Sequence, residues 1–154
     1  MESSEPAVGT TEAVAFRLPF SVPESDIDVL GHASNIAYVR WVQDVAVAHS
    51  NAVGLTWEAY QALGAVFVVR RHEIDYLRSL QFGDPVEATT WIQDVKGVQC
   101  DRMIEFRTGD VVVAKSRTLW VFMSFERQRP VRIPEPIRIA FGFPTAQESA
   151  QSDT

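Results

Sequence analysis

The sequence predicts an α+β domain in which an antiparallel β-sheet wraps around a long central helix. Two observations lead to this fold class. Apolar residues follow a helical period between residues 36 and 53, and after Gly64 they change to the alternating period of strands. Four long strand-like runs then follow one another. A helix followed by a series of strands is typical of α+β rather than α/β folds.

One short strand is expected before the helix. Residues 16–22 have a strand pattern, and Pro19 within them indicates an edge or irregular position, because proline has no N–H for the sheet. A loop over residues 23–34 follows, made of polar and conformationally permissive residues.

The helix carries apolar residues on most of its sides, so we expect it to be buried. Ser34 or Asn35 can cap its N-terminus, and Gly54 stands where a C-terminal stop belongs. A second, short helix is predicted over residues 56–63, ending at Gly64.

The alternating runs predict four strands separated by turn signals that contain glycine. They span residues 65–76, 84–96, 98–108 and 111–125. Between the last two, Thr108-Gly109-Asp110-Val111 is a hairpin signal. We expect the four strands to form an antiparallel meander that wraps the helix.

Composition and charge limit the function classes. The 154 residues are 46% hydrophobic, which suits one packed domain at residues 14–143, with polar and disordered tails expected at 1–13 and 144–154. A net charge of -6 argues against nucleic-acid binding. The absence of a polybasic segment, a long apolar stretch and a secretory signal predicts a cytoplasmic protein with no membrane partner.

Candidate chemistry concentrates in the loop before the helix. Asp26, Asp28 and His32 lie just ahead of the first helical N–H groups, which have no intrahelical partner. Such groups can hold an oxyanion, and a nearby carboxylate can activate water against a bound carbonyl, as acyl transfer requires. The loop offers only one nitrogen donor, so we expect no metal site, and no cofactor motif is present.

Asp28, Gly31, His32, Asn35 and Tyr38 form the pattern Asp-x-x-Gly-His-x-x-Asn-x-x-Tyr. This pattern resembles the signature loop of the 4-hydroxybenzoyl-CoA thioesterase-like enzymes, and it is similar to that of plant fatty acyl-ACP thioesterases. The resemblance implies the hotdog fold and an acyl-CoA thioesterase, with coenzyme A as part of the substrate rather than a cofactor. It also implies a homodimer or homotetramer with sites at the subunit interface.

The resemblance assigns roles to these residues. Asp28 would act as general base or as nucleophile, and the backbone N–H of Asn35 would polarise the thioester carbonyl. His32 would orient water, substrate or Asp28. Gly31 and Tyr38 would belong to the substrate site.

Two features set this chain apart from the plant enzymes within the resembling residues 16–126. Leu30 replaces their asparagine, and Ser79 stands near the position of their glutamate. The plant mechanism therefore does not carry over whole, and acyl-CoA is a better expectation than acyl carrier protein.

A charged run on and just after the predicted strand at residues 65–76 has two interpretations. Arg70, Arg71 or Arg78 could contact the phosphates of CoA. Alternatively, the run is a solvated face with cross-strand ion pairs.

Plainer interpretations stand beside the catalytic one. Asp28 could simply form an Asx turn, and we expect Asp26 to brace the loop. We expect His49 and Cys100 to be packing residues.

Two other functions fit the fold: a non-catalytic acyl-thioester-binding module, and an acyl-CoA hydratase or dehydratase.

Overall fold

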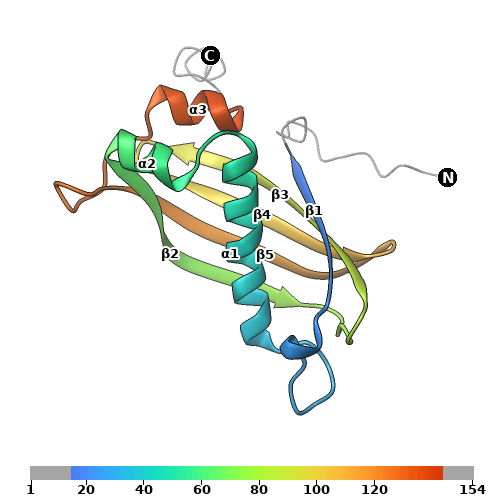
Figure 1. Cartoon of the computed structure of the whole chain (residues 1–154). Coiled ribbons are helices and arrows are strands. Elements are labelled where there is room, and N and C mark those ends of the chain that lie inside the picture. Colours follow the sequence, from blue (N-terminus) through green and yellow to red (C-terminus); the bar gives the residue numbers. More distant parts are fainter. Residues whose placement is uncertain (1–14, 144–154) are drawn as a thin grey trace.

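The computed structural model describes residues 15–143, so the tails expected at 1–13 and 144–154 lie outside this range. The described chain forms a five-stranded sheet, and the long helix α1 (Asn35–Ala52) lies across one of its faces (Figure 1). Each strand pairing is antiparallel. The predicted α+β fold, a sheet wrapped around a central helix, is confirmed.

The remaining elements lie close to their predicted bounds, apart from two short helices that the sequence analysis did not predict, η2 and α3. They are β1 (Phe16–Ser21), η2 (Glu24–Asp26), α2 (Trp57–Leu63), β2 (Ala65–Tyr76), β3 (Pro85–Lys96), β4 (Gln99–Thr108), β5 (Val111–Ser124) and α3 (Glu135–Phe141).

Local sequence sets both ends of α1. The hydroxyl of Ser34 accepts a 3.1 Å hydrogen bond from the N–H of Ala37, so Ser34 rather than Asn35 is the N-cap. Gly54 follows the last turn with a φ of 86°, in the left-handed region that favours glycine. The predicted stop at Gly54 is therefore confirmed.

α1 buries only one of its sides in the single chain. The expectation that it is buried on most sides is wrong, because the sheet packs against one face of the helix. The opposite side leaves Ile36, Val39 and Val47 77%, 41% and 49% exposed. The buried side carries Ala37, Tyr38, Trp41, Val42 and Val45.

The strand order differs from a simple meander. β3, β4 and β5 follow one another as expected, but β2 pairs with β5, and the sheet order is β1-β3-β4-β5-β2. The expected four-strand meander is therefore wrong. Residues 77–84 form too long a connection for a tight hairpin and carry the chain across the sheet to β3. β2 is left at one edge, and β1 with Pro19 lies at the other, as predicted.

The packed interior of the described chain divides along α1. Near its N-terminus, Tyr38 and Trp41 pack against the sheet. Near its C-terminus, α2 and α3 cover a second cluster that includes Tyr60, Phe122 and Phe141 (Figure 1). Sequence reasoning found the equally short α2, whose N-cap Thr56 supplies a capping hydroxyl, but missed α3, whose N-cap position is Pro134 without a capping side chain. The candidate loop and the second cluster thus lie at opposite ends of α1.

No helix within residues 15–143 is both long and apolar enough to cross a membrane.

Candidate active site

The loop before α1 folds back as a small hairpin. Ile27 and Ala33 form an isolated antiparallel bridge, and the N–H of Asp28 donates to the carbonyl of His32 at 3.1 Å. The N–H of Gly31 donates to the carbonyl of Asp28 at 3.0 Å and closes a tight turn. Gly31 has a φ of 87°, which other residues adopt only with strain. The glycine of the motif thus shapes the turn that carries Asp28.

The two carboxylate oxygens of Asp28 have different surroundings. Oδ1 accepts a 2.9 Å hydrogen bond from the N–H of Leu30, so the plainer Asx-turn interpretation is realised. Oδ2 has no hydrogen-bond or ion-pair partner within residues 15–143. The residue is half-buried, so Oδ2 is free to meet water or a substrate.

Asp26 ties the loop to the helix. Its carboxylate is buried and accepts hydrogen bonds from Nε1 of Trp41 at 2.9 Å and from Nη1 of Arg40 at 2.7 Å. Its backbone carbonyl accepts a 3.0 Å bond from the N–H of Ser34. The prediction that Asp26 braces the loop is confirmed.

The start of α1 offers free donors. The N–H groups of Asn35 and Ile36 have no acceptor in the described part of the chain, and both residues are exposed. With the positive end of the helix dipole they suit an oxyanion. The hydroxyl of Tyr76 donates to the carbonyl of Asn35 at 3.4 Å, which links the end of β2 to this site.

Tyr38 and His32 differ in how they are held. Tyr38 is 3% exposed, and its ring centre lies 4.7 Å from that of Trp41 and 5.2 Å from that of Tyr76. Burial raises the pKa of Tyr38 to about 12, with the charge of Tyr76 as a second cause. Tyr38 therefore packs α1 against the sheet, and a substrate contact stays a prediction. The half-buried imidazole of His32 has no hydrogen-bond partner among the described residues.

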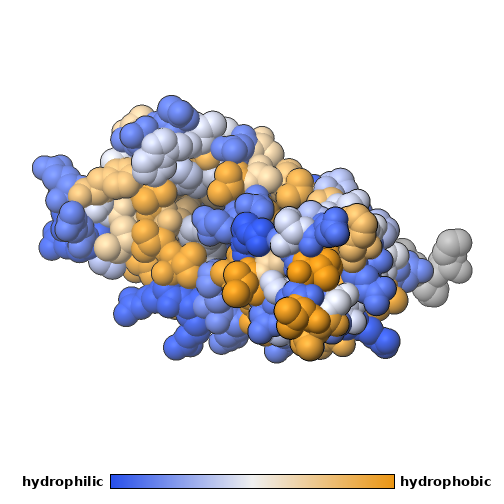
Figure 2. Space-filling model, turned by 60° about the horizontal axis from the view of Figure 1, so that its bottom comes forward, coloured by the Kyte–Doolittle hydropathy of each residue, from blue (hydrophilic) through white to orange (hydrophobic). Residues whose placement is uncertain are grey.

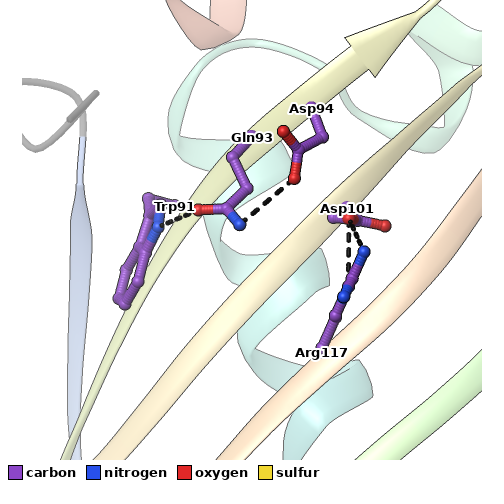
Figure 3. A network of polar contacts seen from close by, with 5 residues as sticks. All are labelled: Trp91, Gln93, Asp94, Asp101 and Arg117. Atoms are coloured by element: carbon purple, nitrogen blue, oxygen red, sulfur yellow. Dashed lines mark hydrogen bonds and ion pairs between the residues drawn. The ribbon is translucent and has the colours of Figure 1, made fainter. Parts of the chain in front are cut away.

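β2 separates Arg71 from the loop. The neighbouring His72 bonds Oγ1 of the buried Thr118 at 2.9 Å on the face toward α1, so Arg71 lies on the opposite face. There it lines a polar hollow of about 380 Å³ with Asp101 and Arg117. Figure 3 shows these last two paired on the strands of that face.

Arg70 and Arg78 occupy other places. Arg70 lies at a register shift between Val69 and Arg71, on the edge strand β2 of the sheet. Arg78 follows β2, in a segment that joins the loop where the N–H of Ala33 donates to the carbonyl of Leu80 at 2.8 Å. Of the three arginines, Arg78 is thus the one that belongs to the segment meeting the loop. A contact with CoA phosphates stays a prediction for all three.

Apolar side chains gather around the loop. Val29 is fully exposed at the tip of the turn, and Leu30, Ile36, Leu77 and Phe82 are all more than half exposed. Figure 2 views the molecule from this end and shows hydrophobic groups at the surface among hydrophilic ones. Exposed apolar side chains at one end of a molecule are a candidate contact surface for another molecule.

A cavity of about 600 Å³ lies toward the other end of α1. Val47 of α1 and Trp57 of α2 line it and are exposed, so it opens between these two helices. Phe67 and Trp120 line it from the sheet. Its volume and apolar lining are typical of a site for a small molecule.

Arg102, in the wall of this cavity, is a residue that sequence reasoning did not single out. It is 4% exposed, and its Nη1 donates to Nδ1 of His49 at 3.0 Å and to Oγ1 of Thr90 at 2.9 Å. Burial, together with the charge of Arg102, lowers the pKa of His49 to about 4, so the ring is neutral and accepts this bond. The available signal was strand alternation, which places Arg102 on the same face as the core residue Ile104.

Cys100 also lines the cavity, and burial raises its pKa to about 12, so it is a poor nucleophile. His49 is buried between the rings of Phe16 and Phe141. Both residues pack as expected.

Within residues 15–143, no group of three or more His, Cys, Asp or Glu side chains is arranged to hold a metal ion.

The profile of a protein family described as the thioesterase-like superfamily matches residues 22–141. The match includes the Asp28 loop, α1 and most of the sheet. The chain belongs to the thioesterase-like superfamily. The predicted resemblance to thioester hydrolases of the hotdog fold is confirmed.

Curated relatives of the chain include plant enzymes. An acyl-[acyl-carrier-protein] hydrolase of the chloroplast from Cuphea viscosissima is 24% identical over 136 residues, which cover 82% of this chain and 33% of the relative. The chain thus spans about a third of the length of the curated relatives it matches.

Solved structures share the fold over most of both chains. A 1,4-dihydroxy-2-naphthoyl-CoA thioesterase from Synechocystis superposes with a TM-score of 0.76 at 14% identity, covering 83% of this chain and 96% of that one. A hypothetical protein from Staphylococcus aureus in complex with CoA superposes with a TM-score of 0.78 at 18% identity, covering 83% and 82%. At these identities the likeness establishes the hotdog fold.

Proposed function

We propose that this thioesterase-like protein hydrolyses acyl-CoA thioesters, with Asp28 as the carboxylate that activates water or attacks the carbonyl. One observation carries the proposal. Oδ2 of Asp28, without a partner among the described residues, lies in a braced loop that leads into the free N–H groups of α1. Acyl transfer needs these two parts: a base or nucleophile, and donors for the developing oxyanion.

In the general-base route, Asp28 takes a proton from water while the water oxygen attacks the thioester carbon. The carbonyl oxygen gains negative charge, which the N–H of Asn35 at the positive end of α1 stabilises. The C–S bond then breaks, and the thiolate of CoA leaves and is protonated. His32, whose ring is not engaged within the described chain, orients the water or Asp28.

In the nucleophilic route, Oδ2 of Asp28 attacks the thioester carbon itself and forms an acyl anhydride as the thiolate leaves. Water then hydrolyses the anhydride and restores the carboxylate. The same N–H groups serve the oxyanion in both routes, so the geometry supports either.

A second copy of the chain would complete the site. The outer edge of β2 has no partner in the described chain, and Val68 and Val69 on this strand are 40% and 39% exposed. Ile36, Val39 and Val47 form an exposed stripe along α1. Val47 lines the cavity together with Val66 of β2, so this stripe and the outer edge of β2 lie on the same side of the molecule. A two-fold pairing of β2 would bury both features in a homodimer.

This pairing would also bring the loop and the cavity together. In this homodimer, the two copies of α1 are related by the two-fold axis between the paired β2 strands, and they run antiparallel. The N-terminal turn of one helix then lies beside the C-terminal half of the other, where the cavity opens. The acyl group would enter the cavity of one subunit while Asp28 of the partner subunit attacks the thioester.

Coenzyme A is the carrier we propose. The solved neighbours whose names refer to CoA match over four fifths or more of both chains, whereas the plant acyl carrier protein hydrolase matches over a third of its own length. Of Arg70, Arg71 and Arg78, we assign the contact with the phosphates of CoA to Arg78, because its segment meets the loop at Leu80.

The test follows thiol release from short, medium, long and aromatic acyl-CoAs, with an enzyme-only blank for the thiol of Cys100. We expect Asp28→Asn to lose about 10²–10⁴-fold in kcat. Asp110→Asn, in the exposed turn between β4 and β5, is the control and should match the wild type. Both variants should keep the wild-type melting temperature.

Other outcomes would overturn parts of the proposal. Undiminished turnover by Asp28→Asn would remove Asp28 from the mechanism. Turnover of acyl carrier protein thioesters alone would replace the carrier but keep the reaction. Binding of acyl-CoA without thiol release would identify a binding module, and hydration of enoyl-CoA would identify a hydratase.

A further inference from the structure

Arg102 is a buried cation without a carboxylate. It is 4% exposed, and its hydrogen bonds within the described chain go only to the neutral groups of His49 and Thr90. Its Nε has no hydrogen-bond partner in that part of the chain. Arginine is almost never fully buried unless it is paired, because removing its charge from water is costly.

The nearby acidic residues do not supply the missing charge. Asp101, next to Arg102 in β4, points to the other face of the sheet and pairs with Arg117 at 2.7 Å (Figure 3). Glu58 lines the rim of the cavity but is exposed and forms no ion pair with Arg102. The guanidinium does lie 5.9 Å and 5.7 Å from the ring centres of Trp120 and Phe141. Such aromatic contacts orient the cation but do not neutralise it.

The position of this charge is informative. Arg102 belongs to the wall of the 600 Å³ cavity, whose other wall residues include Val47, Phe67 and Trp120. An apolar cavity with one cation at its wall matches a ligand with an apolar body and a single anionic group. The planar guanidinium favours a carboxylate over other small polar groups, because it can donate two parallel hydrogen bonds to it.

We propose that the cavity receives an apolar chain ending in a carboxylate, and that Arg102 binds this carboxylate. Under the proposed function, on which this assignment of substrate rests, the ligand is the far end of an ω-carboxyacyl thioester. A free fatty acid offers the same chemistry, and the two experiments below distinguish the two sources.

The first experiment measures binding and does not depend on catalysis. Isothermal titration calorimetry compares octanoate with octanamide, which has the same chain but no charge. We expect the wild type to prefer octanoate roughly 10- to 100-fold, the range of a charge-assisted pair. Arg102→Met should lose this preference and still bind octanamide, while Arg102→Lys should keep part of it.

Controls separate this effect from misfolding and from the catalytic proposal. Arg117→Met removes an arginine from the other face and should bind like the wild type. Asp110→Asn, in the exposed turn between β4 and β5, should also bind like the wild type. Equal affinity of wild type and Arg102→Met for octanoate would overturn the role of Arg102.

The second experiment measures kcat/KM on matched CoA thioesters: succinyl against butyryl, adipoyl against hexanoyl, and suberoyl against octanoyl. If the ligand is part of the substrate, the wild type has a higher kcat/KM for the carboxylated thioester than for the uncharged thioester in one of these pairs. In Arg102→Met this order of kcat/KM is reversed. Octanoate binding through Arg102 without such a preference assigns the site to a free fatty acid. Failure of every thioester in this set and in the wider acyl-CoA panel would refute the proposed acyl-CoA hydrolysis, whereas the titrations would still decide the role of Arg102.

Discussion

The indole N–H of Trp41 donates a 2.9 Å hydrogen bond to the buried carboxylate of Asp26, and this contact fixes the candidate loop to the second turn of α1. Arg40 completes the arrangement at 2.7 Å, but its side chain is 52% exposed, so water weakens this ion pair. The hydrogen bond to Trp41 is therefore the main anchor of the loop. It leaves Asp28, two residues further on, to face outward.

Replacing Asp26 by alanine should destabilise the protein and slow hydrolysis together. The buried indole N–H of Trp41 loses its acceptor, which costs about 1–3 kcal/mol. Asp44→Ala, an exposed carboxylate on α1, is the matched control and should change neither property. Thermal unfolding and kcat/KM measure both effects. A fall in activity at an unchanged melting temperature would instead give Asp26 a chemical role.

Much of the loop and helix could be predicted because its signals are local. Ser34, Gly54 and the turn at Gly31 act on residues within a few positions of themselves. The Trp41–Asp26 anchor spans 15 positions, and the bond between Arg102 and His49 spans 53. Such contacts depend on how the elements pack, so the sequence indicated Arg102 only as a charge on a core face.

The sheet order could not be predicted for a related reason. Alternation gives each strand its inner and outer face, but the edge on which β2 docks depends on where residues 77–84 lead the chain. The exposed stripe of α1 was likewise misjudged, since Val39 and Val47 look like core residues in the sequence. Their exposure in the single chain now supports the proposed homodimer.

Replacing Gly31 by alanine should strain the turn that carries Asp28. The residue has a φ of 87°, and a side chain there costs about 1–2 kcal/mol. No other atom lies within 4 Å of the added Cβ, so the effect comes from the backbone alone. Gly31→Asn should be milder than Gly31→Ala, because asparagine tolerates left-handed conformations. Melting temperature and kcat rank the two variants. Equal values for Gly31→Ala and Gly31→Asn would contradict this explanation.

An aspartate in the exposed stripe of α1 should dissociate the proposed homodimer. Val39→Asp places a charge where two copies of α1 would meet, and burying that charge unpaired is unfavourable. Val111→Asp is the control, because Val111 is 44% exposed, close to the 41% of Val39, but lies beside the turn between β4 and β5. Sedimentation velocity should find monomer only for Val39→Asp, with loss of thioester hydrolysis. A wild type that sediments as a monomer would refute the shared site.

The stability of the protein should fall on acidification as His49 is forced to take up a proton. Its pKa is lowered from 6.5 to about 4, first by burial and then by the charge of Arg102, so between these values the unfolded chain binds one proton more. The stabilisation by neutral His49 is therefore complete above pH 6.5 and is lost as the pH falls toward 4. In this range, the free energy of unfolding of the wild type should fall with each unit of pH by up to about 1.4 kcal/mol more than that of His49→Gln. Glutamine offers Arg102 a carbonyl acceptor but does not titrate, so parallel curves for the two proteins would mean that His49 keeps an ordinary pKa.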